Sequence, residues 1–453
     1  MTLVMPQLDS TSAKDCIVIG AGYTGLSAAY ELAKAGFGVA VYESDDQVGG
    51  LAGSFTANGY QLEKFYHHWF TSDVHITDLV QELGEGDRVV YHPTNTGMYH
   101  ANRAFRLSTP LDVLRFTPLS FFDRLRMAKV AVAARLVRDW RALEKITAEQ
   151  WLRSICGDRV YEVVWGPLLG GKFGPYADKI AAVWFWNKLK LRGGSRGKGG
   201  AENLAYYRGG FAALSERLAG RIKELGGEIH TGTPVHEIVV RDGRVAGIRT
   251  ADGFHAADAV IATPALPVID RLVGEHLTAK ERAQLRSIEY LANVCLVLQL
   301  DRSLSETYWL NVADPNFPYV GVIEHTNFEP AESYGGRHIV YLSKYLPESA
   351  ELYRMSEEEA LEFSLPYLKR MFPQFDISWI LDYSVWRARY SQPIVTLNYS
   401  EKLPPNRTSV EGLFIETMAQ VYPEDRGTNY AVRNGRRIGR EVAEILLRQP
   451  VTA

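Results

Sequence analysis

The stretch that most constrains the fold is CIVIGAGYTG at residues 16–25, where a short apolar run ends in three spaced glycines. The β-branched run at residues 17–19, bounded by glycine, predicts a buried strand. Residues 24–35 carry apolar side chains at helical spacing and predict a helix. Residues 38–42 predict a second strand, which ends at Glu43. Together these signals predict the strand, loop, helix and strand of an α/β protein.

This unit has the spacing of a dinucleotide-binding fingerprint, Gly20-x-Gly22-x-x-Gly25, with Glu43 about 20 residues further on. Gly20 permits a tight turn, Gly22 lets the backbone approach a pyrophosphate, and Gly25 lets helix and strand pack closely. We expect Glu43 to accept hydrogen bonds from the adenosine ribose, which disfavours a 2′-phosphate there. The residues of this unit expected at the cofactor are Gly20, Gly22, Tyr23, Thr24, Gly25, Glu43 and Ser44.

Length and composition indicate a globular chain of two domains. The 453 residues exceed what one core usually supports, and 46% hydrophobic with 23% charged residues is ordinary globular composition. A net charge of −3 argues against a nucleic-acid partner. The three cysteines are far apart and lack metal-ligand spacing, so we expect reduced core thiols, no metal site and a cytoplasmic protein. The first 15 residues lack the pattern of a secretory signal.

Residues 121–141 predict an amphipathic basic helix, a type of segment that could lie on a membrane surface. No window approaches 18 uninterrupted apolar residues, so no membrane-spanning helix is expected. Such an amphipathic helix more often packs its apolar stripe on the protein's own core. We therefore expect no membrane contact.

The rest of the chain alternates between helical and strand patterns. Residues 183–192, VWFWNKLKLR, alternate apolar and polar side chains and predict a strand, followed by a mobile glycine-rich loop, GGSRGKGG. Helices are predicted at residues 76–85, 111–155 and 211–226. Strands continuing the first sheet are predicted over residues 227–263, with turns at 242–243 and 252–253 and a buried strand at 259–262; strands of a separate sheet at 290–345 and 376–400; and a strand, a loop and a long helix over 412–448.

This order predicts an α/β fold with a Rossmann-like nucleotide-binding domain and an α+β substrate domain that has a mixed sheet and helices. The nucleotide-binding domain is assembled from three separated segments, 13–75, 205–275 and 405–450. The substrate domain is assembled from the insertions 76–204 and 276–404.

Four motifs, taken together, resemble the FAD-dependent superfamily of amine oxidases, protoporphyrinogen oxidases and phytoene desaturases. They are the N-terminal fingerprint, the glycine pair in DDQVGGLAGS, the segment GTPVHEI, and the C-terminal GLFIETMAQVYPEDRGTNYAVRNG. UDP-galactopyranose mutase shares this layout more distantly. The resemblance implies FAD, with Gly49, Gly50, Leu51 and Ala52 along the pyrophosphate and a strand at Val235 on the adenine. It also implies that Gly427, Thr428 and Asn429, at the start of the last helix, face the flavin pyrimidine edge, where a helix N-terminus stabilises negative charge.

The chain departs from the pattern of this superfamily in three places. The strand that usually ends in Gly-Asp ends here in Thr417 and Met418, so the ribitol or phosphate contact is expected from Thr417 or Asp425. Amine oxidases usually carry a lysine near flavin N5, whereas YLANVCLVLQL has none, which disfavours amine oxidation. No Ser-Gly-Gly-Cys motif occurs near the C-terminus, so non-covalent flavin is expected.

The segment FYHHWF at residues 65–70 resembles the part that these flavoproteins bring over the flavin ring. If it is a strand, His67 and His68 point to opposite faces, so they are not a metal pair and one of them could transfer a proton at the ring. A histidine packed in an aromatic core is the alternative.

Three further groups are candidates for substrate contacts. Lys188, Lys190 and Arg192 lie on one face of the predicted strand and, with Lys172, could bind an anionic substrate such as a nucleotide or carboxylate; a solvated strand face is the alternative. VIEHTNF places Glu324, His325 and Asn327 together, and RARYSQP contributes Arg389, Tyr390 and Gln392. The catalytic candidates are therefore His67, His68, Lys172, Glu324, His325 and Tyr390.

These features favour an FAD-dependent oxidoreductase that transfers hydride from a small organic molecule to flavin N5. The alternative is a flavin-dependent isomerase of the UDP-galactopyranose mutase type, acting on a sugar nucleotide without net redox change. A flavin-binding protein without catalysis is the third hypothesis, disfavoured by the polar groups near the expected flavin face. The sequence selects no substrate, electron acceptor or oligomeric state.

Overall fold

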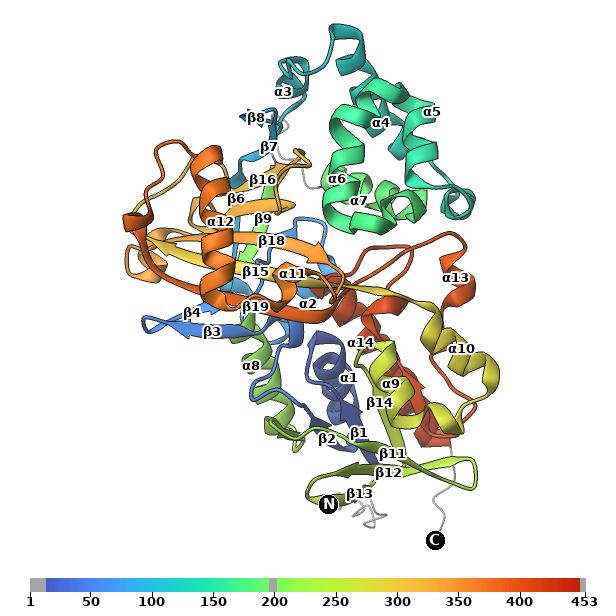
Figure 1. Cartoon of the computed structure of the whole chain (residues 1–453). Helices are drawn as coiled ribbons and strands as arrows, with labels where there is room; N and C mark the ends of the chain where they lie inside the picture. Colours follow the sequence, from blue (N-terminus) through green and yellow to red (C-terminus); the bar gives the residue numbers. More distant parts are fainter. Residues whose placement is uncertain (1–13, 195–201, 449–453) are drawn as a thin grey trace, which may run out of the picture.

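The computed structural model describes residues 14–194 and 202–448 of the chain. Figure 1 shows two halves, one around a five-stranded parallel sheet and the other around a seven-stranded sheet with a group of helices beside it. The predicted fold class, a parallel Rossmann-like sheet joined to a mixed sheet, is confirmed.

The five-stranded sheet draws its strands from three segments that are far apart in the sequence. Neighbouring strands are parallel throughout. In spatial order the strands are β10 (Glu228–His230), β2 (Gly38–Tyr42), β1 (Asp15–Ile19), β14 (Ala259–Ala262) and β20 (Leu413–Ile415).

Both faces of this sheet are covered, which explains why its strands are continuous apolar runs. Val18 of β1 belongs to the core shared with three helices, whereas Ile17 and Ile19 face a small antiparallel sheet. The helices are α1 (Tyr23–Lys34), α8 (Gly210–Glu224) and α14 (Thr428–Arg448), and the small sheet contains β11 (Glu237–Arg241), β12 (Arg244–Thr250) and β13 (Gly253–Ala256).

The small sheet corrects one prediction, since β11 to β13 do not continue the parallel sheet. Asp242 and Gly243 both have positive φ, as a tight hairpin requires, so β11 pairs with β12 and not with a parallel neighbour. The predicted turns and the buried strand at 259–262 are confirmed. Period-two alternation identifies a strand but does not identify its partner.

Two glycines let α14 pack directly on α1. A Cβ at Gly435 would lie 2.2 Å from the backbone oxygen of Thr24, and a Cβ at Gly439 would lie 2.6 Å from that of Ala28. Because the paired residues increase in number together, the two helices run parallel. Thr428 begins α14 about seven residues ahead of Gly435, so the α14 N-terminus projects roughly 10 Å beyond that of α1.

Gly435→Ala should lower the free energy of unfolding by about 1–3 kcal/mol, because the Thr24 carbonyl cannot move without separating the two helices. Urea unfolding followed by circular dichroism would measure this change. Gly220→Ala is the matched control, since it lies in α8 with no atom within 4 Å of an added Cβ. The control should be neutral or stabilise by up to about 1 kcal/mol. Equal effects of the two substitutions would contradict the packing argument.

The seven-stranded sheet crosses the middle of the molecule (Figure 1). Its strand β15 is almost wholly buried: Leu296 faces helix α12 (Glu357–Met371), and Cys295 faces the core that includes α1 and α8. In order the strands are β19 (Ile380–Pro393), β15 (Tyr290–Leu300), β18 (His338–Leu346), β17 (Gly321–Glu324), β16 (Trp309–Val312), β7 (Thr96–His100) and β8 (Arg103–Arg106). The predicted separate sheet is confirmed, and β7 and β8 extend it from a segment where no strand is predicted.

The remaining elements connect these sheets. Two short sheets contain β3 (Ser54–Ala57) with β4 (Tyr60–Glu63), and β5 (Trp69–Phe70), β9 (Glu202–Tyr207) and β6 (Val89–Thr94). The helices are α2 (Val74–Glu82), α3 (Pro110–Leu114), α4 (Phe121–Leu136), α5 (Ala148–Val160), α6 (Gly166–Phe173), α7 (Ala182–Gly194), α9 (Leu266–Val273), α10 (Ala279–Ser287), α11 (Glu351–Arg354) and α13 (Tyr399–Lys402).

The strand predicted over residues 183–192 is wrong, because this segment forms α7. The first half of α7 is buried all round, and such a helix shows no 3.6-residue period in its sequence. Lys188 and Arg192 therefore share a helix face, whereas Lys190 lies on another, so the predicted three-residue basic face is also wrong. Of the predicted glycine-rich loop, residues 195–200 lie outside the described part of the chain.

Candidate active site

The glycine loop at residues 20–25 joins β1 to α1 with the geometry that the fingerprint predicts. Gly20 has φ +97°, and a Cβ at Gly25 would lie 1.9 Å from the backbone oxygen of Gly20. No atom lies within 4 Å of a Cβ at Gly22, which is also the N-cap of α1 and supplies no side-chain cap. The Tyr23 hydroxyl donates to the Phe211 carbonyl (2.6 Å), so Tyr23 offers its backbone at this point. The start of α1 is thus shaped for a phosphate group.

The second glycine pair packs against the first loop. Gly49 and Gly50 have φ of 113° and 57°, and the Gly49 N–H donates to the Ala21 carbonyl at 2.8 Å. A Cβ at Gly50 would lie 3.3 Å from the Gly22 Cα. Leu51 and Ala52 follow in a short 3₁₀ turn, Gly50–Ala52. The two predicted pyrophosphate segments therefore lie side by side.

Glu43 lies directly after β2, beside the glycine loop. Its Oε2 accepts from the Ala21 N–H at 2.7 Å, and its Oε1 accepts from the Asp45 N–H at 2.9 Å and the Ser44 hydroxyl at 3.1 Å. The carboxylate is half-buried at the carboxyl edge of the parallel sheet. This is where a dinucleotide ribose binds in such folds.

The predicted strand at Val235 is wrong, because Val235 precedes β11 in an irregular segment. That segment nevertheless lies along the end of β2. The Thr233 N–H donates to the Glu43 carbonyl at 2.8 Å, and the Gly232 N–H donates to the Asp45 carbonyl. The adenine contact of Val235 stays a prediction.

Glu43→Ala should weaken FAD binding by about one to two decades, since a hydrogen bond to a charged group contributes about 1.5–3 kcal/mol. Titration of the apoprotein with FAD, followed by flavin fluorescence, would measure the dissociation constant. Asp46→Ala is the control, because Asp46 is an exposed acid three residues along the chain. Unchanged affinity in Glu43→Ala would count against the ribose contact.

The start of α14 lies against the segment that follows β4. The Thr428 hydroxyl accepts from Trp69 Nε1 at 2.9 Å, and Asn429 Oδ1 accepts from the Ile76 N–H at 3.1 Å. Both side chains therefore hold protein contacts, and a flavin contact would fall to the backbone N–H groups of this first turn. A Cβ at Gly427 would meet no atom within 4 Å, which leaves space beside that turn.

Thr417 is placed differently from its predicted role. It is nearly fully buried, and its hydroxyl accepts from the Ala419 N–H at 3.2 Å to cap its own 3₁₀ turn. This geometry gives no support to a ribitol contact through the Thr417 side chain.

A group of polar side chains, here called the charge cluster, meets immediately ahead of α14. Asp425 Oδ2 lies 2.5 Å from Lys188 Nζ of α7, and Arg426 Nη2 donates to the Tyr345 hydroxyl of β18 at 2.7 Å. Gln392 of β19 links the two, since its Oε1 accepts from Arg426 Nε at 3.2 Å and its Nε2 donates to Asp425 at 3.4 Å. The cluster consists of Lys172, Lys188, Tyr345, Gln392, Asp425 and Arg426.

Cationic groups outnumber carboxylates in the charge cluster. Burial opposes ionisation of Asp425, but Lys188, Lys172 and Arg426 outweigh it and hold the Asp425 pKa below its usual value. Burial lowers the pKa of Lys172 to about 7, with Asp425 opposing the change and the neighbouring cations adding to it. Lys188, Arg426 and, below about pH 7, Lys172 thus surround one carboxylate with an excess of positive charge, which suits an anionic group.

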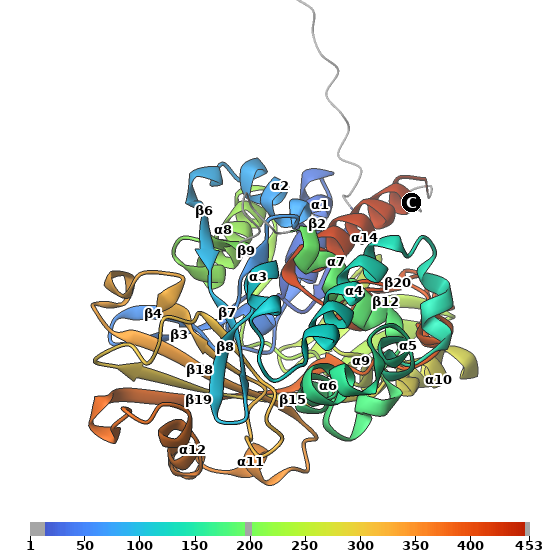
Figure 2. The ribbon, with the colours of Figure 1, turned by 90° about the horizontal axis from the view of Figure 1, so that it is seen from above.

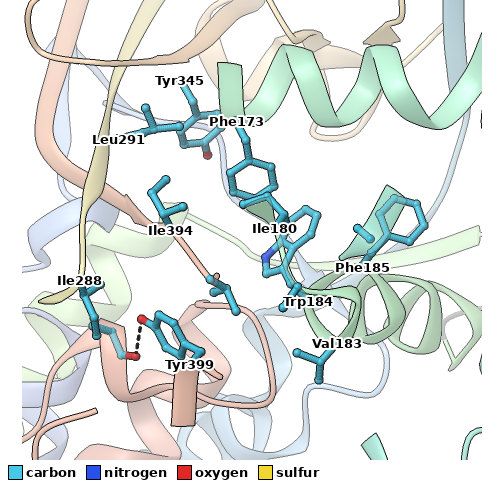
Figure 3. Close-up of a cluster of buried hydrophobic side chains, with 14 of the residues drawn as sticks. Phe173, Ile180, Val183, Trp184, Phe185, Ile288, Leu291, Tyr345, Ile394 and Tyr399 are labelled. Atoms are coloured by element: carbon cyan, nitrogen blue, oxygen red, sulfur yellow. Dashed lines mark hydrogen bonds between the residues drawn. The ribbon is translucent and has the colours of Figure 1, made fainter. Parts of the chain in front are cut away.

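Aromatic side chains surround the Lys172 ammonium. Its Nζ lies 4.8 Å from the ring centre of Tyr345 and 5.1 Å from that of Trp184. Figure 3 shows Phe173 beside Trp184, with Tyr345 and Leu291 nearby, and the Phe173 and Trp184 ring centres are 4.6 Å apart. These rings desolvate the ammonium, which explains its lowered pKa.

His67 and His68 lie in irregular chain between β4 and β5, so the predicted strand is wrong. The rings nevertheless contact different neighbours: His67 Nδ1 lies 2.6 Å from the Phe65 carbonyl, and His68 Nδ1 lies 3.0 Å from the Tyr308 hydroxyl. Burial lowers the pKa of His67 to about 4 and that of His68 to about 3, so both rings are neutral near pH 7. Arg426 contributes to the lowered pKa of His67, which places His67 near the charge cluster.

Glu324 and His325 are engaged in structural contacts. The Glu324 carboxylate accepts four hydrogen bonds from residues 303–305, and His325 Nε2 lies 2.7 Å from the Tyr334 hydroxyl. Asn327 donates to the carbonyls of Ser305 and Thr307. These contacts tie the loop at residues 303–308 to β17, and they give no support to the predicted catalytic roles.

The two ends of RARYSQP are placed separately. Gln392 joins the charge cluster, whereas Tyr390 packs beside Tyr290 and lies 3.5 Å from Arg271 Nη1. Arg389 pairs with Glu348 at the surface.

Across residues 14–194 and 202–448, no group of His, Cys, Asp or Glu could hold a metal ion.

Sequence reasoning missed Arg426 and Tyr345 altogether. Arg426 lies within the C-terminal motif and Tyr345 at the end of a predicted strand region, but neither position by itself indicates a site. The cluster is assembled from five segments that are distant in the sequence. One usable signal was the RGTN stretch, since a cation just before a helix N-terminus opposes the helix dipole and needs a negative partner.

Comparison with known proteins identifies several relatives. A probable zeta-carotene desaturase of Synechococcus elongatus is 27% identical over 290 residues, covering 57% of this chain and 60% of that protein. A 4,4'-diapolycopene oxygenase of Methylomonas sp. is 24% identical over 367 residues, covering 69% of this chain and 67% of that protein. The chain thus spans about two thirds or less of the length of these curated relatives.

The solved structure of a protein assigned as a protoporphyrinogen oxidase, from Exiguobacterium sp. 255-15, has the same fold. Its TM-score is 0.77 at 18% identity, covering 96% of this chain and 99% of that one. The model of the family described as flavin containing amine oxidoreductase matches residues 23–442. As the resemblance predicts, the chain belongs to this family of FAD-dependent oxidoreductases.

Proposed function

We propose that the protein binds FAD without a covalent link and oxidises a small organic substrate that carries an anionic group. The observation that carries the proposal is the excess of cationic side chains in the charge cluster, directly ahead of α14. Because α14 projects roughly 10 Å beyond α1, its N-terminus and the glycine loop suit the flavin and the pyrophosphate of one extended cofactor.

The residues that would hold FAD are those of the two glycine segments, Glu43 and the first turn of α14. When bound, the flavin supplies a hydride acceptor at N5. The open space at Gly22 and Gly427 is where backbone would approach the cofactor. No lysine occurs in β15, which disfavours an amine as the substrate. A substrate of another class is in keeping with the desaturase named among the relatives.

The chain's own side chains would bind and orient the substrate. Arg426 presents a guanidinium fork already ordered by Tyr345 and Gln392, which suits a carboxylate or phosphate. Lys188 is tied to Asp425 and contributes charge with little freedom to move. Lys172 could exchange a proton at Nζ near neutral pH, and His67 could accept one at Nε2.

The test begins with the purified protein, which should be yellow and release its flavin on heating or acid treatment. Candidate substrates are then added anaerobically while flavin absorbance is followed, and bleaching by a compound with a carboxylate or phosphate supports the proposal. A colourless protein that binds NAD would overturn the cofactor. Bleaching only by uncharged compounds would overturn the anionic substrate.

The mutase alternative rests on the same positive charge, which also suits the diphosphate of a sugar nucleotide. It predicts activity only after reduction with dithionite, with no net consumption of reductant. Turnover of a sugar nucleotide under those conditions, without oxidative bleaching, would favour the isomerase over the oxidoreductase.

For an anionic substrate, kcat/KM should fall as the pH rises through about 7. Lys172 is cationic below its pKa of about 7 and neutral above it, so the site loses a positive charge at higher pH. Because kcat/KM reports the free enzyme, its pH profile should show this break. Lys172→Met should remove the break, and an unchanged profile in that variant would assign it to another group.

A further inference from the structure

Exposed apolar side chains gather on α3 and α4, at the end of the molecule away from the five-stranded sheet (Figure 1). Among described residues, 14 large apolar side chains are exposed, and seven of them lie within residues 111–136. Leu136 and Phe122 are 73% and 72% exposed to solvent. Single exposed apolar residues are common on proteins, but such a concentration marks an interaction surface.

Helix α4 carries two apolar stripes on opposite sides. Met127, Val130 and Ala134 form the buried stripe that faces the protein. Phe121, Leu125, Val132 and Leu136 fall on the opposite side at 100° per residue and are all exposed. The expectation that this helix packs an apolar stripe on the protein's own core is confirmed, and the outer stripe is a second one. The outer stripe has no protein neighbour that would explain it within the described chain.

Basic side chains flank the outer stripe of α4. By the same helical spacing, Arg135 lies on one side of the stripe and Lys129 on the other. Residues 111–138 contain six Lys or Arg and two Asp, although the whole chain has a net charge of −3. The four basic residues Arg115, Lys129, Arg135 and Arg138 form no ion pair with an acidic group of residues 14–194 or 202–448.

We propose that this face, made by α3 and α4, docks on the surface of an anionic lipid bilayer. An apolar stripe flanked by Lys and Arg is the pattern of a helix that lies in the membrane interface, with its apolar side chains among the acyl chains and its cations at the headgroups. No helix among the described residues is long and apolar enough to cross a membrane. Docking would thus be peripheral.

The proposed surface lies one helix away from the charge cluster. Trp186 of α7 donates from Nε1 to the Ala134 carbonyl of α4 at 2.8 Å, and α7 also carries Lys188. Figure 2 looks onto this end of the molecule, where α4 and α7 lie together. Docking would hold α7 close to the lipid without involving the residues proposed to bind FAD or substrate.

Vesicle flotation tests the proposal, with the flavin-loaded full chain and two kinds of vesicle. The protein should float with vesicles of equal parts phosphatidylcholine and phosphatidylglycerol, bind less to pure phosphatidylcholine, and dissociate at high salt. Phe122→Ser with Leu136→Ser should lower the partition by about tenfold or more, because the two most exposed of the seven apolar side chains on this face are removed. Lys129→Glu with Arg135→Glu should abolish the preference for the anionic vesicles.

The matched control is Ile377→Ser with Leu381→Ser, which removes two apolar side chains exposed by 58% and 51% elsewhere on the molecule. This pair should bind vesicles like the unsubstituted protein. Failure of the unsubstituted protein to float, or equal binding by the α4 variants, would overturn the proposal. The proposal would also be overturned if the unsubstituted protein formed oligomers, bound no vesicles, and became a monomer in the α4 variants. The face would then be an interface between copies of the chain. Flavin content, measured in every variant, verifies folding and is independent of the proposed activity.

Discussion

Arg426→Met should raise KM for the anionic substrate by about 10²–10³-fold, because truncating one partner of a desolvated charged pair costs about 2–5 kcal/mol. The Arg426 guanidinium is held in place by Tyr345 and Gln392 before any substrate arrives, so little ordering is needed on binding. Arg426→Lys should recover only part of the affinity, since an ammonium keeps the charge but loses the fork. Steady-state kinetics with the substrate found by the flavin-bleaching screen would measure both.

Arg389→Met is the matched control for Arg426. Arg389 lies on β19, the strand that also carries Gln392 of the charge cluster. It pairs with Glu348 at the surface, where both side chains are about half exposed. Loss of such an exposed pair should leave KM within about twofold. If Arg426→Met changed KM no more than the control, Arg426 would be a structural residue and the anionic substrate would lose its main support. Flavin content should stay the same in all three variants.

Much of the cofactor half was predictable because its signals are local. Gly20, Gly22 and Gly25 act through backbone geometry within six residues, and Glu43 follows from the length of the intervening helix. The approach of α14 to α1 had a readable signal as well, in the pair Gly435 and Gly439. Small residues four apart on a helix allow close contact, but the sequence does not say which helix they contact.

The charge cluster was not predictable, since its members come from α6, α7, β18, β19 and the loop before α14. Lys172 and Lys188 were predicted to bind an anionic substrate, but Lys188 was placed on a strand that is in fact the helix α7. Proximity in sequence also misled, because Glu324 and His325 are adjacent but face different neighbours. A side chain's direction depends on local backbone geometry and packing, and no spacing rule supplies that for irregular chain.

His67→Ala should lower the turnover rate by about 10²–10⁴-fold while FAD stays bound, if His67 is the proton acceptor. Its Nδ1 lies 2.6 Å from the Phe65 carbonyl, an oxygen that can only accept, so Nδ1 carries the proton and the Nε2 lone pair is available. The lowered pKa of about 4 keeps this lone pair available down to acidic pH. His67→Gln should be as slow as His67→Ala, because a glutamine amide can replace the Nδ1 hydrogen bond but cannot act as a base.

His68→Ala is the matched comparison for His67→Ala. His68 Nδ1 contacts the Tyr308 hydroxyl, and the ring packs against Phe70 and Trp309, so its removal should mainly lower stability by opening a cavity. The rate of flavin reduction, measured by stopped flow, should therefore differ between the two variants. The melting temperature should be lowered in both. If both substitutions left the reduction rate nearly unchanged, the segment FYHHWF would be aromatic core. Lys172 would then be the candidate proton acceptor near the charge cluster, because its pKa of about 7 lets it change charge near neutral pH.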